Sequence, residues 1–227
     1  MAAVRVGSTM SRTEPTLTGP LESTGFVRAA NGWICYLPIP WNAEIGNTEL
    51  TVTADGYTET LTLSVRAASY SYKDYSTKSQ LMSPYIGADD APDAVRRLLT
   101  TDGGEIQWAV GGFVQPFLDS FDTPLLYGMT EYVGRSYSER STNYGYGGRT
   151  STNVVIRPKK SKDSMIVPAS GHVLLAEDLG GSYGCTVVID HGAGLRSIFY
   201  GLTALDVEAG DDVKQGQLPV SYTHLRA

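Results

Sequence analysis

The stretch that decides the fold of this chain is Gly184-Cys-Thr-Val-Val-Ile-Asp-His-Gly-Ala-Gly-Leu195. Its first half is rich in β-branched residues, and its second half holds two glycines around one alanine. Runs of β-branched residues bounded by glycine are typical of strands joined by short turns. We therefore predict a strand, a tight glycine turn and a return strand.

A second glycine-rich stretch follows, Val207-Glu-Ala-Gly-Asp-Asp-Val-Lys-Gln-Gly-Gln217. Gly210 and Gly216 punctuate it, and glycine supplies the positive φ that many tight turns require. We predict that this stretch is a hairpin.

The composition indicates a folded protein made of many short strands. The chain has 227 residues, enough for one large or two small domains, and 41% of them are hydrophobic, which is enough for real cores. Glycine (25) and tyrosine (14) are frequent, while only 19% of the residues are charged. A net charge of -6 argues against a nucleic-acid partner, because nucleic-acid binders usually carry a basic face.

The chain shows no signal peptide and no apolar run near the roughly 20 residues that a membrane span needs. Any contact with a membrane is expected to depend on an N-terminal anchor that is missing from this sequence.

The first part of the chain, residues 1–68, is predicted to be an immunoglobulin-like β-sandwich. Trp33–Pro40 is a strand that ends in prolines, which cannot donate to a ladder. Glu49–Thr53 and Thr60–Val65 alternate apolar and polar residues, as half-buried strands do. Asp55-Gly56 stands between them and is a strong signal for a hairpin turn.

A connector over residues 69–107 is predicted to contain one short helix near 92–100, because acidic residues and then a proline mark a helix start. The second domain is predicted over residues 108–219. Residues 220–227 resemble the translation of a sequencing adapter. We expect them to be no part of the natural protein, and His224 is given no role.

Two cysteines, Cys35 and Cys185, lie far apart in the sequence. An extracellular disulfide is one interpretation. The favoured interpretation is two buried free thiols in separate domains, because a free cysteine behaves as a small hydrophobic residue.

The two glycine-rich stretches resemble the core of the lysostaphin-type (LytM-like) zinc endopeptidases, which cut peptide cross-links in bacterial cell walls. The segment 1–68 is similar to the accessory domain that precedes the catalytic domain in many of these enzymes. The resemblance implies an all-β protein: an immunoglobulin-like sandwich, a short helical connector and a LytM-like antiparallel sheet domain that is truncated at its C-terminus.

In that family a His-x-x-x-Asp strand and the second histidine of a His-x-His strand hold the zinc ion, and a Tyr-x-His-Leu segment assists. Here the first ligand position falls on Ser151 or Thr152, and the aspartate position falls on Val155 or Ile156. The assisting histidine is replaced by Gly201. Apolar side chains cannot bind such a cation. We therefore predict no metal ligands and no catalytic residue at these positions.

The remaining histidines and several tyrosines are candidates for other roles. His191 matches a family position that is not a zinc ligand, and we interpret it as a structural residue that binds backbone groups of a turn. His172 is predicted to be an exposed strand residue. The candidate groove residues are His191, Tyr200, Tyr144 and Tyr146, and the last two lie in a loop that could stack on sugar rings.

The predicted function is that of a degenerate LytM-like domain without catalysis or cofactor, which binds peptidoglycan or an envelope protein. One alternative is an active zinc metalloendopeptidase that cleaves peptidoglycan cross-link peptides, with zinc as cofactor. Another is a carbohydrate- or protein-binding β module. The resemblance implies an extracytoplasmic location in the bacterial cell envelope.

Overall fold

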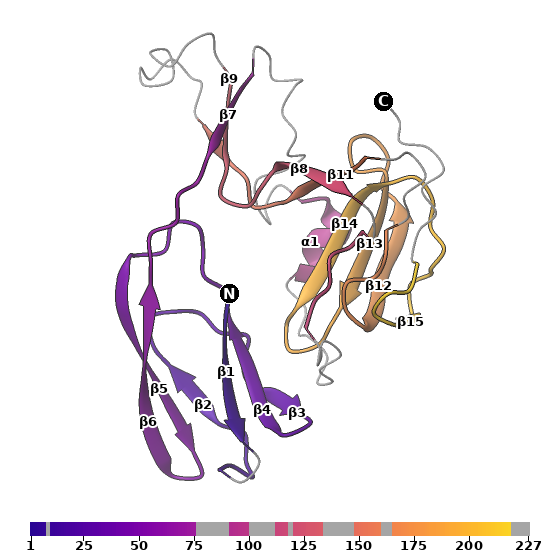
Figure 1. Ribbon diagram of the computed structural model, residues 1–227. Helices are drawn as coiled ribbons and strands as arrows, with labels where there is room; N and C mark the ends of the chain where they lie inside the picture. Colours follow the sequence, from indigo (N-terminus) through magenta and orange to yellow (C-terminus); the bar gives the residue numbers. More distant parts are fainter. Residues whose placement is uncertain are drawn as a thin grey trace.

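The computed structural model is almost entirely β, as predicted, with one short helix among the residues that it describes (Figure 1). It describes residues 1–7, 10–75, 91–99, 112–117, 120–133, 148–159 and 165–218. Within these ranges no helix is long and apolar enough to cross a membrane.

The N-terminal part is a sandwich of two three-stranded sheets around one apolar core. The first sheet has the order β1-β4-β3, with strands Ala2–Gly7, Gly32–Leu37 and Val27–Ala29. The second has the order β2-β5-β6, with strands Thr16–Thr18, Gly46–Ala54 and Tyr57–Val65. Alternate residues of β4 and β5 point into the core, among them Cys35, Leu37, Leu50 and Val52. Cys35 is therefore a buried free thiol, as predicted, whereas the free thiol of Cys185 is only half-buried in the other part of the chain.

The β5–β6 hairpin turns at Asp55 and Gly56, which confirms the turn predicted there. Ala54 pairs with Tyr57, and both turn residues have a positive φ, 45° and 85°. This is the geometry that matches the twist of the two strands. The carboxylate of Asp55 also accepts hydrogen bonds from the Arg12 amide at 2.7 Å and from the Thr13 hydroxyl at 2.6 Å. The turn therefore ties the segment after β1 to the tip of the hairpin.

The C-terminal sheet has the order β14-β13-β12-β15, with strands Arg196–Leu202, Cys185–Asp190, Gly171–Asp178 and Asp212–Val213. The predicted strand, glycine turn and return strand are confirmed as β13, the turn 191–195 and β14. The hairpin predicted over 207–217 is wrong. This stretch holds one two-residue strand, β15, which pairs with the edge of β12 instead of with itself. Turns at Gly210 and Gly216 leave too few residues between them for two paired strands.

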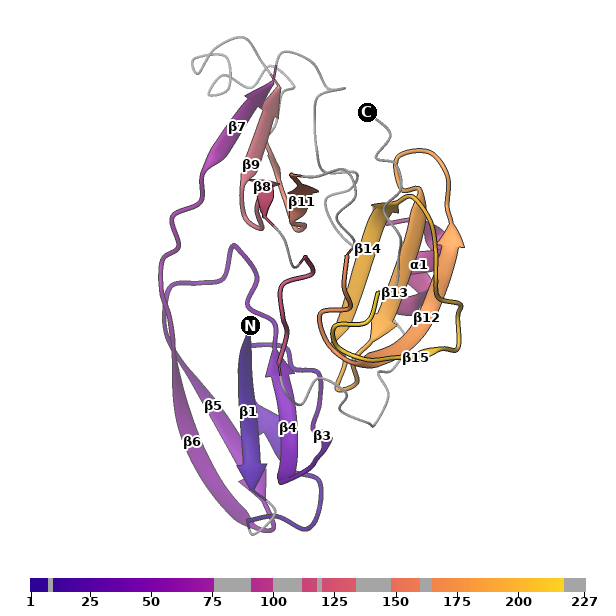
Figure 2. The same ribbon diagram turned by 45° about the vertical axis from the view of Figure 1, so that its right-hand side comes forward.

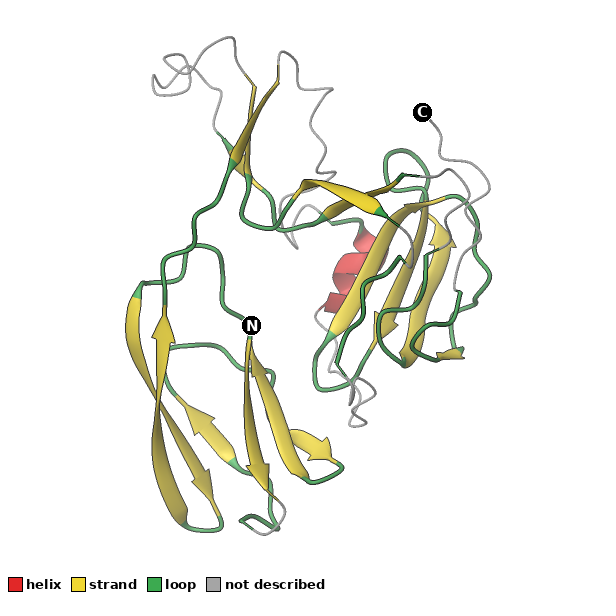
Figure 3. Cartoon of the chain, in the orientation of Figure 1, coloured by secondary structure: helices red, strands yellow, loops and turns green. Residues whose placement is uncertain are grey.

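Both faces of the central strand β13 are covered, which explains its continuous apolar run. Helix α1 (Asp93–Leu99) packs on one face through Val95, which confirms the predicted helix (Figure 3). The other face is covered by residues from outside the sheet, among them Phe117, Met165 and Val207.

Two small sheets lie beside the C-terminal sheet (Figure 2). Strands β8 (Phe121–Leu125) and β11 (Val155–Pro158) pair with each other. The second small sheet has the order β10-β9-β7, with strands Arg149–Thr150, Thr130–Val133 and Tyr72–Tyr75. Because β7 pairs in parallel with β9, part of the predicted connector is a strand of a sheet.

Replacing Asp55 by asparagine is expected to lower the melting temperature of the sandwich at pH 7 and to lower it less at pH 3. Hydrogen bonds from Thr13 and the Arg12 amide hold the pKa of Asp55 below its ordinary value of 3.8. The carboxylate therefore stabilises the fold above pH 3.8, and this stabilisation is lost as the pH falls through the lower folded pKa. Asparagine tolerates the positive φ. Equal effects of the substitution at pH 7 and pH 3 in thermal unfolding would contradict the expectation.

Candidate functional site

Ser151, the position of the first family ligand, is part of a closed turn. It is 1% exposed. Its hydroxyl donates a hydrogen bond to the carbonyl of Asn153 at 2.9 Å and accepts one from the Asn153 amide at 3.1 Å. Its backbone amide donates to Met129 O, and its carbonyl accepts from the amide of Gly128, both at 2.8 Å. The alternative position, Thr152, is exposed. The hydroxyl of Ser151 thus closes its own turn, and its backbone amide and carbonyl hold this turn against the loop between β8 and β9.

The position of the aspartate ligand is part of the β8–β11 ladder. Val155 pairs with Leu125, and Ile156 packs against the core on the face of the sheet opposite α1. Both side chains are half-buried and carry no oxygen or nitrogen that could bind a metal.

Gly201, the position of the assisting histidine, lies in a β-bulge. Val187 of β13 pairs with Phe199 of β14, and Cys185 pairs with Leu202. Two residues of β14, Tyr200 and Gly201, therefore lie opposite the single residue Thr186. Gly201 has a φ of 72°. A side chain here would point into open space, because a Cβ atom would meet nothing within 4 Å. The left-handed backbone of the bulge, however, favours glycine over any other residue.

Tyr200 lies on the side of β14 that faces α1. It packs in the cluster of Val95 and Val188, with its ring 5.6 Å from the ring of Tyr183. Phe199, by contrast, packs on the opposite face of the sheet. Tyr200 is thus partly buried on the side of the sheet that faces α1, and its role as a groove residue stays a prediction. The other predicted groove tyrosines, Tyr144 and Tyr146, lie outside the described residues.

His191 is fully buried directly after β13. Its Nδ1 lies 2.8 Å from the carbonyl of Ser170, which can only accept, so this nitrogen carries the proton. In the neutral ring Nε2 then accepts from the Ser197 hydroxyl, also at 2.8 Å. The edge of the Phe113 ring closes the site, with 5.0 Å between ring centroids. These contacts agree with the predicted structural role, and they leave His191 no exposed surface that could line a groove.

Gly171 makes the burial of His191 sterically feasible. A Cβ atom there would lie 2.5 Å from the carbonyl oxygen of Asp190 and 2.9 Å from His191 Nδ1. Sequence reasoning missed both this glycine and Ser197. Ser197 pairs with Ile189. Pairing the strand residues one by one on either side of the five-residue turn 191–195 would have predicted that Ser197 lies near His191.

The residues present do not fit a catalytic zinc ion. Such an ion needs three protein ligands with nitrogen, sulfur or oxygen donors around one point. In the described part of the chain, no group of three His, Cys, Asp or Glu side chains could hold a metal. His172 lies on β12, is partly exposed as predicted, and pairs with Asp212 at 2.8 Å.

Comparison with known proteins adds a family assignment for the C-terminal part. Residues 151–219 match the model of peptidase family M23. The match covers the three positions described above and the four-stranded sheet that contains Gly201, so the resemblance seen in the sequence is confirmed for this segment. We call the sheet β14-β13-β12-β15, with α1 and the segment 151–219, the M23-type domain.

A solved structure from Pseudomonas aeruginosa, described as a peptidase M23, has a similar fold over most of the chain. The two are 19% identical with a TM-score of 0.53, and the alignment covers 96% of this chain and 80% of the other. A comparison with curated proteins finds no match.

The stability of the protein is expected to fall as the pH drops from 7.5 to 5.5. Burial lowers the pKa of His191 below its ordinary value of 6.5. Below pH 6.5 the unfolded chain therefore binds more protons at this histidine than the folded chain does, so the free energy of unfolding falls. Urea unfolding at several pH values measures this slope. His191→Gln is expected to remove it, and His172→Gln, at an exposed histidine, is expected to keep it. A slope that survives in His191→Gln would assign the effect to another group.

Proposed function

We propose that this chain is a non-catalytic member of the M23 group that acts by binding peptidoglycan or an envelope protein outside the cytoplasmic membrane of a bacterium. Its N-terminal sandwich would serve as an immunoglobulin-like accessory domain. The observation that carries the proposal is that all three family positions within residues 151–219 have been given structural roles in the fold.

Replacement of the ligand side chains alone could leave the backbone of a zinc site unchanged. The backbone at these three positions argues against such an unchanged site. Ser151 is enclosed in a turn, Val155 is a ladder residue, and Gly201 has the left-handed backbone of a bulge. A chain without these ligands would lack the metal that lowers the pKa of a water molecule, which is the step that hydrolysis by this family requires. A binding role retains the fold and does not need that chemistry.

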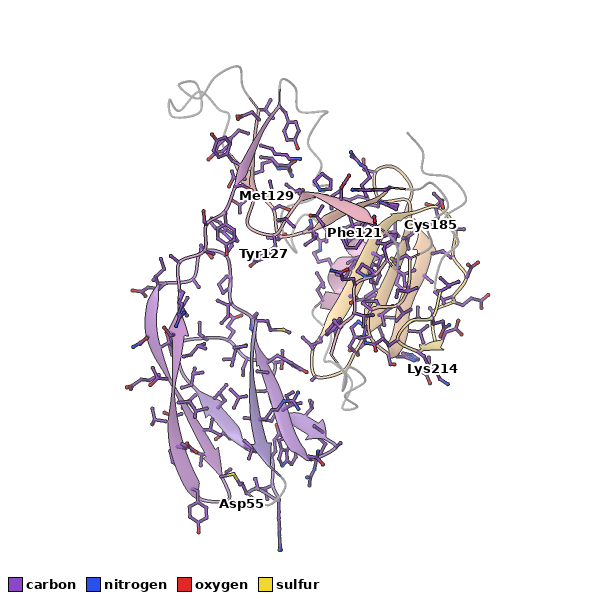
Figure 4. The ribbon with its side chains drawn as sticks, viewed as in Figure 1. Asp55, Phe121, Tyr127, Met129, Cys185 and Lys214 are labelled. Carbon is purple, nitrogen blue, oxygen red and sulfur yellow. The ribbon has the colours of Figure 1, made fainter. Side chains whose placement is uncertain are left out.

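An exposed apolar patch beside Ser151 supports a binding role. Tyr70, Leu126 and Tyr127 are 42%, 45% and 39% exposed. The Tyr70 ring lies over Gly128, since a Cβ on that glycine would come within 2.2 Å of it, and Gly128 bonds to Ser151. Figure 4 shows Tyr127 beside the chain that rises from the sandwich. Aromatic faces of this kind stack on sugar rings.

The unmodified chain is expected to bind well under one equivalent of zinc. The measurement is metal analysis of full-length protein after incubation with zinc and removal of free metal. Gly201→His is expected to add no zinc and to cost about 1–2 kcal/mol, because a side chain is strained at this φ. One tightly bound equivalent in the unmodified chain, with release of peptides from purified peptidoglycan, would establish the active endopeptidase instead.

Tyr127→Ala is expected to weaken binding to purified cell-wall sacculi about 2- to 12-fold, since an aromatic stacking contact contributes about 0.5–1.5 kcal/mol. Co-sedimentation measures the bound fraction. Tyr57→Ala is the matched control, because Tyr57 is 81% exposed at the far tip of the sandwich.

The same assay separates the two classes of ligand. Binding that persists on protease-treated sacculi identifies the wall polymer, and binding lost on that treatment identifies an envelope protein. Equal binding by Tyr127→Ala and the unmodified chain would remove this patch from the proposal, and an absence of binding by the unmodified chain would contradict the proposal itself.

A further inference from the structure

The central strand of the first sandwich sheet is buried on both faces. Cys35 and Leu37 point into the sandwich core, as expected. Ile34 and Tyr36 point the opposite way, yet Ile34 is fully buried and Tyr36 is only 8% exposed. A sheet of a free-standing sandwich would present this outer face to water. Something other than the sandwich itself therefore covers it.

The cover is the glycine turn of the M23-type domain. Ala193 is fully buried and forms one apolar cluster with Ile34 and Tyr36. Val27, Ala29 and Leu195 pack around this cluster. We call this cluster the seam.

At the edge of the seam Gly194 lies directly against Thr24. A Cβ atom on Gly194 would be 3.0 Å from the Thr24 side chain, so a larger residue at 194 would crowd Thr24. Thr24 is itself held to β4, because its amide donates to Tyr36 O at 2.9 Å and its hydroxyl accepts from the Tyr36 amide at 3.0 Å. The contact is therefore made by an ordered part of the sandwich.

The turn is built to present Ala193 outward. Gly192, Ala193 and Gly194 have φ values of 75°, 54° and 73°, three successive left-handed residues. The His191 amide donates to Leu195 O at 2.8 Å, and the Gly192 amide donates to the carboxylate of Asp190 at 2.8 Å. These bonds lie within the turn itself, and they hold Ala193 against the outer face of β3 and β4.

We propose that the seam is a permanent docking surface, which joins the sandwich and the M23-type domain into one rigid body. The partner that fits the outer face of β3 and β4 is the chain's own turn 191–195. Domains of one chain that share only a small or polar contact move relative to each other. Here the contact is apolar and fully buried at its centre, and undocking would expose Ile34, Ala193 and much of Tyr36 to water, which is unfavourable.

The seam also sets which part of the M23-type domain stays accessible. The turn lies at the start of β14, and Gly201 lies near its end, about 20 Å further along at the usual rise of a strand. The docked sandwich therefore holds one end of the sheet and leaves the Gly201 end uncovered by the seam. This inference does not depend on the proposed function, since it concerns how the two parts of the chain are joined.

Two glutamate variants test the seam from opposite sides. Ala193→Glu places a charge on the turn, and Ala29→Glu places one on β3. Each is expected to increase the radius of gyration measured by X-ray scattering of the full chain. Each is also expected to speed amide exchange about tenfold or more in both 24–36 and 191–196.

Ala209→Glu is the matched control, because Ala209 is exposed in a turn of the same domain, and it is expected to change neither quantity. Continued protection of the β5–β6 hairpin and of β12 shows that both parts remain folded. The proposal is overturned if both seam variants scatter like the unmodified chain, or if each variant affects only its own side.

A measurement on the unmodified chain decides the question even if a glutamate variant fails to fold. In hydroxyl-radical footprinting, Tyr36 is expected to be protected relative to Tyr57, the exposed tyrosine of the same sandwich. Oxidation of Tyr36 at a rate similar to that of Tyr57 would show that the seam is open in solution and would overturn the proposal.

Discussion

The buried ring of His191 is the constraint on which the C-terminal half of the structure depends. One nitrogen bonds to the segment before β12 and the other to β14, so a single side chain links three neighbouring parts of the sheet at the point where the chain reverses. The ring is costly to bury unless both nitrogens are satisfied. That requirement explains the glycine at position 171, the hydroxyl at Ser197 and the ordered turn that follows.

The order of that turn has consequences on both of its sides. Toward the sheet it joins β13 to β14, whose pairing begins next to the turn with Asp190 and Arg196. Toward the sandwich it presents Ala193 to the outer face of β4. The same local geometry thus bears on the pairing of two strands and on the way in which the two parts of the chain are joined.

The positions that the family resemblance assigns to zinc ligands take part in the packing of this chain. A ligand site must keep polar atoms free and convergent, whereas Ser151 uses its hydroxyl within a turn and Val155 contributes an apolar side chain to a ladder. A protein that keeps the sheet but not the ligands retains a surface with exposed aromatic residues. Binding is the use to which such a surface is suited.

The sequence by itself determined the features that depend on neighbouring residues. The Asp55-Gly56 turn, the helix after Pro92 and the reversal after Asp190 were all predictable, because turn and cap preferences act within a few residues. Tertiary structure decided the rest. Contacts between residues far apart in the chain produce the pairing of β15 with β12, the face of Tyr200, the parallel β7–β9 pair and the covering of β4 by a distant turn. Local preferences carry no information about which distant segment will supply the partner.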